Sequence, residues 1–431
     1  MRAHAPIGPA LVLAGLVAGI LGGEAAGASD ARSALVLTGA AFAAAGLVTR
    51  RGARLLIAVL AFAVLGTAVS ERALHGLEVS PLTTPIARRA GVTARVTLVD
   101  DPDSTRFSTW VLVRVDSFAI AHHRVRDGGR RRVLVRASGD AAPRLRLLAA
   151  GERAVLRGWL ETLSGFDRRW RWRHAVGTLR AYDLLGARPA RSPLDRVANA
   201  TRAAVLRGSE TLAPGDRALL AGFLLGDTRG VPPAVVESFR RAGLTHLVAV
   251  SGENVAFVLA LFAPILRRLS LLGRCAGGIT VLVVFGTMTR WEPSVARAIS
   301  MSVIALVAGY LGRPASGVRL LALAVIALLV VDPFLVHSVG FQLSCGASLG
   351  IALLARPITA RLPGPRWFVR SSASRRPRNS AWHPCSSPSS APCRSSRCPP
   401  TSWPYRWPRR SRCGGWDPAS WAARSVPPRR K

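Results

Sequence analysis

The segment Arg217–Val258, with the sequence RALLAGFLLGDTRGVPPAVVESFRRAGLTHLVAVSGENVAFV, decides the fold class. It joins an apolar run, a Gly-Asp break, a helix that opens on Pro232-Pro233 and a second apolar run. Proline suits the first turn of a helix, and Gly243 suits the position after its last turn. The helix between them has one apolar and one charged side, which predicts that it lies along a membrane surface.

Apolar runs on both sides of this segment predict a helical multi-pass membrane bundle. The chain has 431 residues, of which 49% are hydrophobic, and a bilayer core of ~30 Å takes about 20 helical residues to cross. We expect eight spans: Pro9–Leu21, Ala34–Val48, Leu55–Val69, His246–Leu266, Ala276–Met288, Val295–Tyr310, Val318–Val331 and Val339–Leu354. The first run could instead be a signal peptide, because Ala26-Gly27-Ala28 resembles a cleavage site.

Arginines flank these runs in a pattern that predicts the orientation. Arg50, Arg51 and Arg54 lie between the second and third runs, and Arg267, Arg268 and Arg274 follow the fourth. Arg313 and Arg319 separate the sixth run from the seventh, and Arg356, Arg361, Arg366 and Arg370 follow the eighth. The positive-inside rule puts all of them on the cytoplasmic side. We therefore expect a cytoplasmic N-terminus and an extracytoplasmic segment 71–196.

Residues 71–196 have the pattern of a soluble all-β domain. Apolar residues alternate along five short segments, which are expected to be strands: Val92–Leu98, Val111–Val115, Arg132–Arg136, Arg153–Leu160 and Gly177–Tyr182. Five strands with turn-rich loops between them predict an OB-like barrel. The expected fold class is an α-helical multi-pass membrane bundle with an inserted extracytoplasmic all-β OB-like barrel domain.

The charge of the chain favours an anionic partner. The net charge is +36, which suits phospholipid headgroups or nucleic acid without choosing between them. Composition changes after residue 370: Ser371–Lys431 carries 13 basic residues, one acid and many Ser, Pro, Trp and Cys. Disordered segments are usually poor in Trp and Cys, so translation out of frame explains this tail better than a disordered basic arm. Its cysteines form no CxxC pair, and no metal site is predicted.

Polar residues interrupt two of the predicted spans. They are Ser251, Gly252, Glu253 and Asn254 in one span and Gln342 and Ser344 in another. Polar groups at membrane depth are costly unless they face a cavity or a partner helix. These residues are therefore candidates for pore lining or gating, with interhelical packing as the alternative. Arg297 could contact a phosphate backbone or anchor its helix at the interface.

Four ordered motifs resemble the ComEC-type competence proteins, the inner-membrane channels for incoming DNA in transformable bacteria. They are LLGD (224–227), FRRAGLTHLVAVSG (239–252), EPSVARA (292–298) and GFQLS (340–344), and SGFDRRWRWRHAVGTLRAYDL (164–184) is similar to the end of the family's periplasmic OB domain. The resemblance implies structural roles for Gly226, Asp227, Gly243, His246, Glu292 and Pro293. From the residues alone, Asp227 can simply terminate a helix. The family continues with more membrane helices and often a metallo-β-lactamase-like nuclease domain, so we expect a C-terminally truncated or frameshifted member.

The basic and aromatic residues of 71–196 invite an interpretation as a single-strand binding surface. OB surfaces commonly combine a positive groove with aromatic stacking platforms. The segment has 24 Arg against 13 Asp and Glu, and the candidates are Arg168, Arg169, Trp170, Arg171, Trp172 and Arg173. Trp110 and Trp159 could instead fill the core, and an Arg-rich chain makes basic patches without any function.

No catalytic residue, metal ligand or cofactor is predicted, because the sequence has no P-loop and no HxHxDH-like cluster. The resemblance implies that the chain conducts single-stranded DNA inward during natural transformation. It also implies the bilayer, other DNA-uptake machinery and a second copy of the chain as partners. A transporter or channel for another solute, or a truncated member that conducts nothing, stays open.

The expected organisation has five parts. Residues 1–70 form three N-terminal spans, 71–196 the OB-like domain, 197–245 amphipathic connecting helices, 246–366 a competence-type membrane domain of about five spans, and 367–431 the basic tail.

Overall fold

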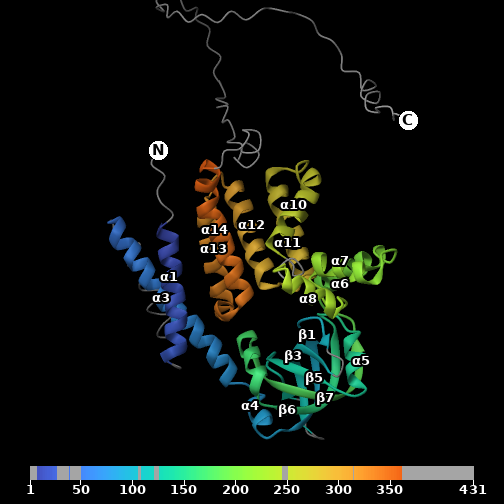
Figure 1. Ribbon diagram of the computed structural model, residues 1–431. Helices are drawn as coiled ribbons and strands as arrows, with labels where there is room; N and C mark the ends of the chain where they lie inside the picture. The colour runs from blue at the N-terminus through green and yellow to red at the C-terminus, as the bar shows by residue number, and fades with distance from the viewer. Residues whose placement is uncertain are drawn as a thin grey trace, which may run out of the picture. The chain divides into compact units, whose positions relative to one another are not determined.

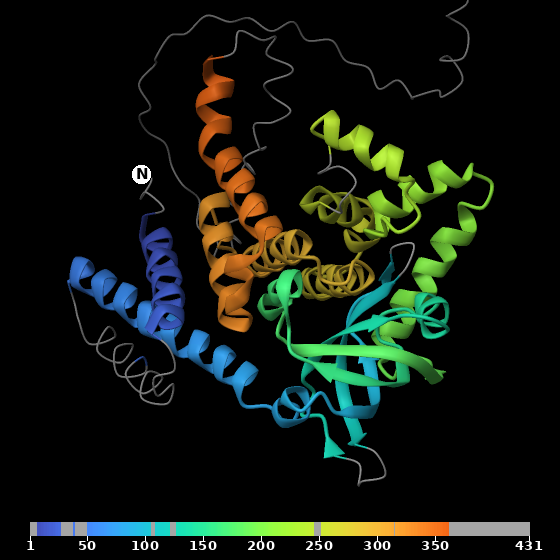
Figure 2. The same cartoon turned by 60° about the horizontal axis from the view of Figure 1, so that its bottom comes forward.

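The computed structural model describes residues 7–26, 38, 50–104, 108–120, 126–244, 251–313 and 315–361. They belong to one compact unit, Met1–Gly364. In that unit, apolar helices meet a β-sheet at one end (Figures 1 and 2). The predicted run Ala34–Val48, apart from Thr38, and the tail 367–431 lie outside the described residues.

In the part of the chain that the structure describes, two long helices precede the sheet and eight helices follow it. They are α1 (Ile7–Ala26) and α3 (Arg51–Glu78), then α6 (Pro193–Gly208), α7 (Pro214–Leu225), α8 (Pro233–Arg241), α10 (Gly252–Leu266), α11 (Leu271–Met288), α12 (Pro293–Tyr310), α13 (Gly317–Val331) and α14 (Val339–Arg361). Among the described residues, four helices are long and apolar enough to cross a membrane: Gly8–Ala25, Gly52–Glu78, Leu271–Met288 and Pro293–Tyr310. Gly252–Leu266, Gly317–Val331 and Val339–Ala355 are shorter apolar helices. Length and composition thus support a multi-pass membrane protein.

The described helices overlap the predicted runs, but several extend beyond them: α14 continues to Arg361, α11 begins at Leu271, and the largest difference is in α3. The third run was predicted to end at Val69, but α3 continues to Glu78. Ser70, Glu71 and Leu74 are buried in this extension, so tertiary contacts hold a polar sequence in helical form. The helix therefore leads directly to the sheet.

Glycines let α1 and α3 approach closely. Gly15, Gly19 and Gly23 form a stripe at intervals of four residues along α1, the small-residue spacing of packed membrane helices. A Cβ at Gly15 would lie 2.6 Å from the carbonyl oxygen of Val59, and one at Gly19 would collide with that of Ala63. The two backbones are therefore in direct contact.

The sheet contains all five predicted strands and two short ones that the sequence did not indicate. The strands are β1 (Gly91–Leu98), β2 (Asp103–Ser104), β3 (Thr109–Ile120), β4 (Arg126–Asp127), β5 (Arg132–Ala137), β6 (Arg153–Glu161) and β7 (Ala175–Arg188). Their order is β1-β6-β7-β5-β3-β2, and an additional pairing joins β1 to β3. The five long strands therefore pair in a closed ring, in which β5 and β7 are parallel and the other neighbours antiparallel.

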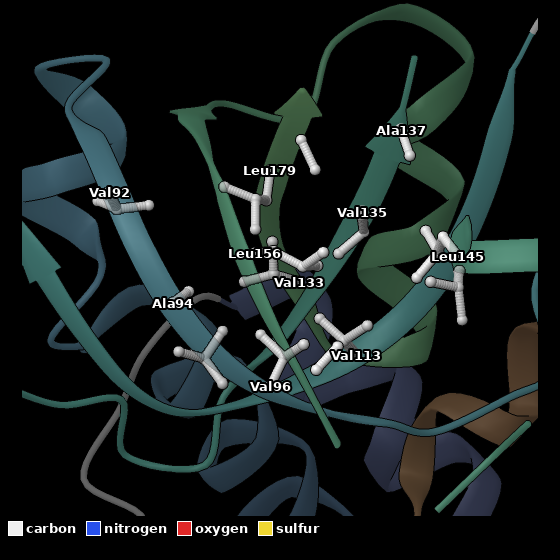
Figure 3. Close-up of a cluster of buried hydrophobic side chains, with 14 of the residues drawn as sticks. Val92, Ala94, Val96, Val113, Val133, Val135, Ala137, Leu145, Leu156 and Leu179 are labelled. Atoms are coloured by element: carbon white, nitrogen blue, oxygen red, sulfur yellow. The ribbon is translucent and has the colours of Figure 1, made fainter. Parts of the chain in front are cut away.

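Apolar side chains, which alternate with polar ones along the strands, fill the inside of this ring. In β1 every second residue is buried, and Figure 3 shows its side chains meeting those of β3, β5, β6 and β7. The short helices α4 (Thr83–Ala87) and α5 (Ala141–Arg146) add Ile86 and Leu145 to the same cluster. With its interior filled by aliphatic side chains, the ring can offer a ligand only its outer surface and its edges.

Candidate functional site

A cavity of about 1130 Å³ lies where the sheet meets the ends of α11, α12 and α13. Its walls come from the β1–β2 loop, β3, the 3₁₀-helix η1 (Gly165–Arg173), the α11–α12 turn and the 3₁₀-helix η2 (Pro333–His337). The lining includes Asp100, Asp103, Trp110, Arg114, Arg130, Arg132, Arg169, Trp170, Trp172, Arg173, Asp195, Arg290, Glu292, Pro293, Asp332, Phe334 and His337. The surface is therefore aromatic and carries charges of both signs.

The Arg-Trp repeat of 168–173 forms η1 on one wall of this cavity. Its four arginines are exposed and its two tryptophans are half-buried. Arg169 lies over the ring of Phe166 at 3.7 Å, and Arg173 lies over that of Trp170 at 5.3 Å. Arginines stacked on aromatic faces make a planar, positively charged surface that suits nucleobases and phosphates. Arg169, Trp170, Trp172 and Arg173 line the cavity, whereas Arg168 and Arg171 do not.

Trp172 joins the sheet to the helices. Its ring stacks on His337 with centroids 3.9 Å apart and meets Phe334 edge-on at 5.4 Å. The next residue but one, His174, contacts the Asp332 carboxylate at 3.0 Å through Nε2. His337 stacks directly on Trp172, whereas the guanidiniums over Trp170 belong to the exposed Arg173 and Arg169 and lie 5.3 and 5.8 Å from its centroid. Trp170 is therefore the better stacking platform of the two tryptophans.

The other aromatic candidates of the sheet divide between core and surface. Phe118 is buried in the ring, Trp110 lines the cavity, and Phe166 is 74% exposed. Trp159 is 46% exposed and contacts Tyr182 edge-on at 4.9 Å. The interpretation of Trp159 as a core residue is therefore wrong.

The tight turn between α11 and α12 also lines the cavity. Arg290 and Trp291 have positive φ angles of 56° and 54°, a conformation that is uncommon for residues other than glycine. Pro293 occupies the first turn of α12, and Glu292 precedes it as the N-cap residue. Glu292 and Pro293 thus line the same cavity as the Arg-Trp repeat, although that repeat lies 119 or more positions earlier in the chain.

A buried cluster of charges fixes this turn to the sheet. Asp101 accepts hydrogen bonds from Arg290 at 2.7 Å and from Arg202 of α6 at 2.8 Å. Arg202 also lies 3.3 Å from Asp227, which pairs with Arg229. We call these five residues the charge cluster. It ties the β1–β2 loop, α6, the α7–α8 loop and the α11–α12 turn together.

The arginines decide the ionisation of the carboxyls in the charge cluster. Burial opposes the charged form of Asp101, but Arg290 and Arg202 outweigh it and hold its pKa below the usual range. Burial likewise opposes the charge of Asp227, and Arg229 holds that pKa low. Asp100 next door differs, because burial raises its pKa despite the ion pair with Arg173 at 2.9 Å. The two neighbouring carboxyls therefore differ in acidity.

Sequence analysis missed most of the charge cluster. Asp227 follows the end of α7, as predicted, with Gly226 at φ 73° as the C-cap. Its ion pairs with Arg202 and Arg229 were not predicted. The pair of Arg202 with Asp101 was not predicted either, since these residues lie 101 positions apart. The pair Asp100-Asp101 directly after a predicted strand was the available signal, and it had been interpreted only as a turn.

The polar residues of the predicted spans have defined partners. Ser251 is the N-cap of α10 and its hydroxyl accepts from the Glu253 N–H, while Asn254 Nδ2 donates to the carbonyl oxygen of Phe223 at 2.7 Å. Gln342 Nε2 donates to the carbonyl oxygen of Val336 at 2.6 Å. Glu253 and Gln342 are exposed. Helix capping and interhelical contacts thus account for Ser251, Asn254 and Gln342, and pore lining by these residues stays a prediction.

Three other candidates, Arg297, Ser344 and Gly252, lie close together between the helices. Arg297 is 7% exposed, its Nε donates to Ser344 Oγ at 2.9 Å, and its Nη2 lies against Gly252. Gly243 follows α8 at φ 70°, in the position predicted for it. His246 lies outside the described residues. Within the described part of the chain, no group of three or more His, Cys, Asp or Glu could hold a metal ion.

The helices, the sheet and the cavity together indicate a multi-pass membrane protein. Its strands β1 to β7, which we call the β-domain, meet the helices at a polar cavity. Residues 223–387 match the model of the Competence protein family. ComE operon protein 3 of Bacillus subtilis (strain 168) is 28% identical over 144 residues. Both matches support a ComEC-type competence protein, the family that the motifs resemble.

These matches cover part of each protein. The aligned stretch is 33% of this chain, and the chain covers 19% of ComE operon protein 3. No solved structure matches the chain. The family match begins at residue 223 and takes in α8 and α10 to α14, so Asp227, Gly252, Glu292, Arg297 and Ser344 all lie inside it.

Proposed function

We propose that this chain is a component of a membrane channel that takes up single-stranded DNA during natural transformation. The family match supports a role in competence. The observation that carries the proposal is the convergence of the Arg-Trp repeat and the start of the EPSVARA motif on one cavity. The β-domain would receive the strand there, at the end of the competence-type helices.

The chemistry of the cavity fits a single strand better than a small apolar solute. Trp170 offers a ring on which bases can stack, and Arg169 and Arg173 offer charges for phosphates. Stacking is worth about 1–3 kcal/mol per base and tolerates any sequence. The closed ring of five strand pairings also supports the proposal that 71–196 is an OB-like module.

The test measures binding of a labelled oligo-dT to the full chain in nanodiscs of zwitterionic lipid. The double variant Arg169→Gln/Arg173→Gln removes two charges from the cavity. Its matched control, Arg144→Gln/Arg146→Gln, removes two exposed charges from α5, which does not line the cavity. We expect the cavity variant to bind about tenfold more weakly and to lower the salt dependence by about 0.7 per lost phosphate contact. The control should resemble the parent.

Equal losses in both double variants would mean nonspecific attraction by a basic chain and would contradict the proposal. Absence of binding at low salt would remove the β-domain from the mechanism. In that case a channel for another solute, or a member that conducts nothing, becomes the better interpretation.

A further inference from the structure

Arg297 is a buried cation without a carboxylate partner among the described residues. Only 7% of it is exposed. Its two hydrogen-bond partners are neutral: Ser344 Oγ accepts from Nε at 2.9 Å, and Met301 Sδ lies 3.1 Å from Nη1. A buried charge is costly unless it is paired, so this position requires an explanation beyond packing.

The N-terminal turns of three helices surround this guanidinium. Gly252 begins α10, and a Cβ there would lie 2.7 Å from Arg297 Nη2. Arg297 and Ser344 lie in the second turns of α12 and α14. Each helix N-terminus behaves as roughly half a positive charge. Glu253 is exposed and forms no ion pair with Arg297 in the described structure, so this positive region is not neutralised from within.

Such an arrangement favours a bound anion. A guanidinium beside a helix N-terminus offers several N–H donors in fixed directions, the geometry that binds phosphate oxygens. The absence of a side chain at Gly252 lets the first turn of α10 approach Nη2 closely, because a Cβ there would lie 2.7 Å from it. Ser344 adds a hydroxyl beside Nε.

We propose that Arg297, Ser344 and the first turn of α10 form a binding site for one phosphodiester group. This inference rests on the proposed function for its preferred source, the backbone of a single strand. Ala296, the residue before Arg297, lines the cavity. Arg297 follows it on α12, so the proposed site adjoins the end of the helix that borders the cavity. A phospholipid headgroup carries the same phosphodiester and is the other source.

The test uses dimethyl phosphate, the smallest phosphodiester, with the full chain in detergent micelles. A ligand that binds the folded state raises the Tm in a saturable way, and chloride at equal ionic strength corrects for screening. We expect Arg297→Gln to weaken the apparent affinity tenfold or more. Arg319→Gln, which removes an exposed charge from α13, should leave it unchanged.

Two further variants decide the question if Arg297→Gln does not fold. Gly252→Ala keeps the charge but places a methyl group against Nη2, so it should weaken binding about as strongly. Arg297→Lys keeps a charge without the planar fork and should be intermediate. An equal response of the parent, Arg297→Gln and Gly252→Ala would overturn the proposal.

Competition identifies the source of the phosphodiester. Displacement of dimethyl phosphate by oligo-dT supports the nucleic-acid assignment, while displacement by phosphatidylglycerol alone would replace it with a lipid site. The two proposals can also fail separately. If oligo-dT binds through the cavity arginines but dimethyl phosphate does not bind, only the Arg297 site falls. If dimethyl phosphate binds but oligo-dT does not, the proposed function falls.

Discussion

At the scale of single residues, Gly19 is expected to decide the packing of α1 on α3. A Cβ at this position would collide with the carbonyl oxygen of Ala63, which is backbone and cannot rotate away. Gly19→Ala should therefore destabilise the helix pair by about 1–3 kcal/mol, the usual cost of overpacking. The measurement is unfolding of the purified protein in mixed detergent micelles.

Gly22 provides the matched control on the same helix. Nothing lies within 4 Å of a Cβ at this position, so Gly22→Ala should be neutral or stabilising by up to about 1 kcal/mol through helix propensity. If both variants lose the same stability, the close approach of the two backbones does not contribute to folding.

Individual residues also show what a single sequence can and cannot predict. Local chemistry placed Gly243 after the end of a helix, and it has the left-handed conformation expected there. Gly226, which the sequence marked only as part of a Gly-Asp break, has a positive φ as well. Spacing identified Arg297 and Ser344 as polar residues in apolar runs, but it could not show that they bind each other. Contacts between residues that lie far apart in the chain depend on how the helices and strands pack. The local hydrophobic period of a sequence carries no information about that packing.

At the scale of elements, hydrophobic period predicted the strands well because one face of each strand is buried. In β1 and β6 the alternation is complete. The closed ring was harder to predict, since β1 pairs with both β3 and β6 and the period carries no information on neighbours. Predicted helix ends were least accurate in α3, where contacts with the rest of the fold extend the helix through Glu71 and Leu74.

The charge cluster makes the connection between the sheet and the helices sensitive to acid. Because the arginines hold the pKa of Asp227 below its unfolded value of about 3.9, its contribution to stability is complete above that value. The contribution is lost as the pH falls below about 4, through the folded pKa. Asp227→Asn should therefore lower the Tm at pH 7 and reduce the further loss of Tm between pH 6 and pH 3.5.

Asp216→Asn is the control for this pH series. Asp216 is exposed at the start of α7, so this variant should follow the parent at every pH. Asp100, whose pKa burial raises, acts in the opposite direction but is present in all three proteins. Parallel Tm curves for the parent and Asp227→Asn would show that the carboxylate of Asp227 does not link folding to pH.

At the scale of the whole molecule, the helices alternate in direction between two ends of different charge. The α11–α12 turn and η2 contact the β-domain through Arg290 with Asp101 and through Asp332 with His174. α11 has 18 residues and is therefore about 27 Å long, which places Arg267 and Arg268 at the end away from the β-domain. Arg290, Glu292 and Asp332 lie at the end beside it. By the positive-inside rule, this separation favours an extracytoplasmic β-domain.

This orientation can be measured with single cysteines in a protein whose native cysteines have been replaced by alanine. Arg144→Cys reports on the β-domain and Arg268→Cys on the α10–α11 turn, and both positions are exposed. A membrane-impermeant maleimide should label Arg144→Cys in intact spheroplasts and Arg268→Cys only after lysis. Full labelling of both in detergent shows that both thiols react. The reverse pattern would put the cavity on the cytoplasmic side, where it could not receive a strand from outside the cell, and the proposed direction of DNA movement would then be wrong.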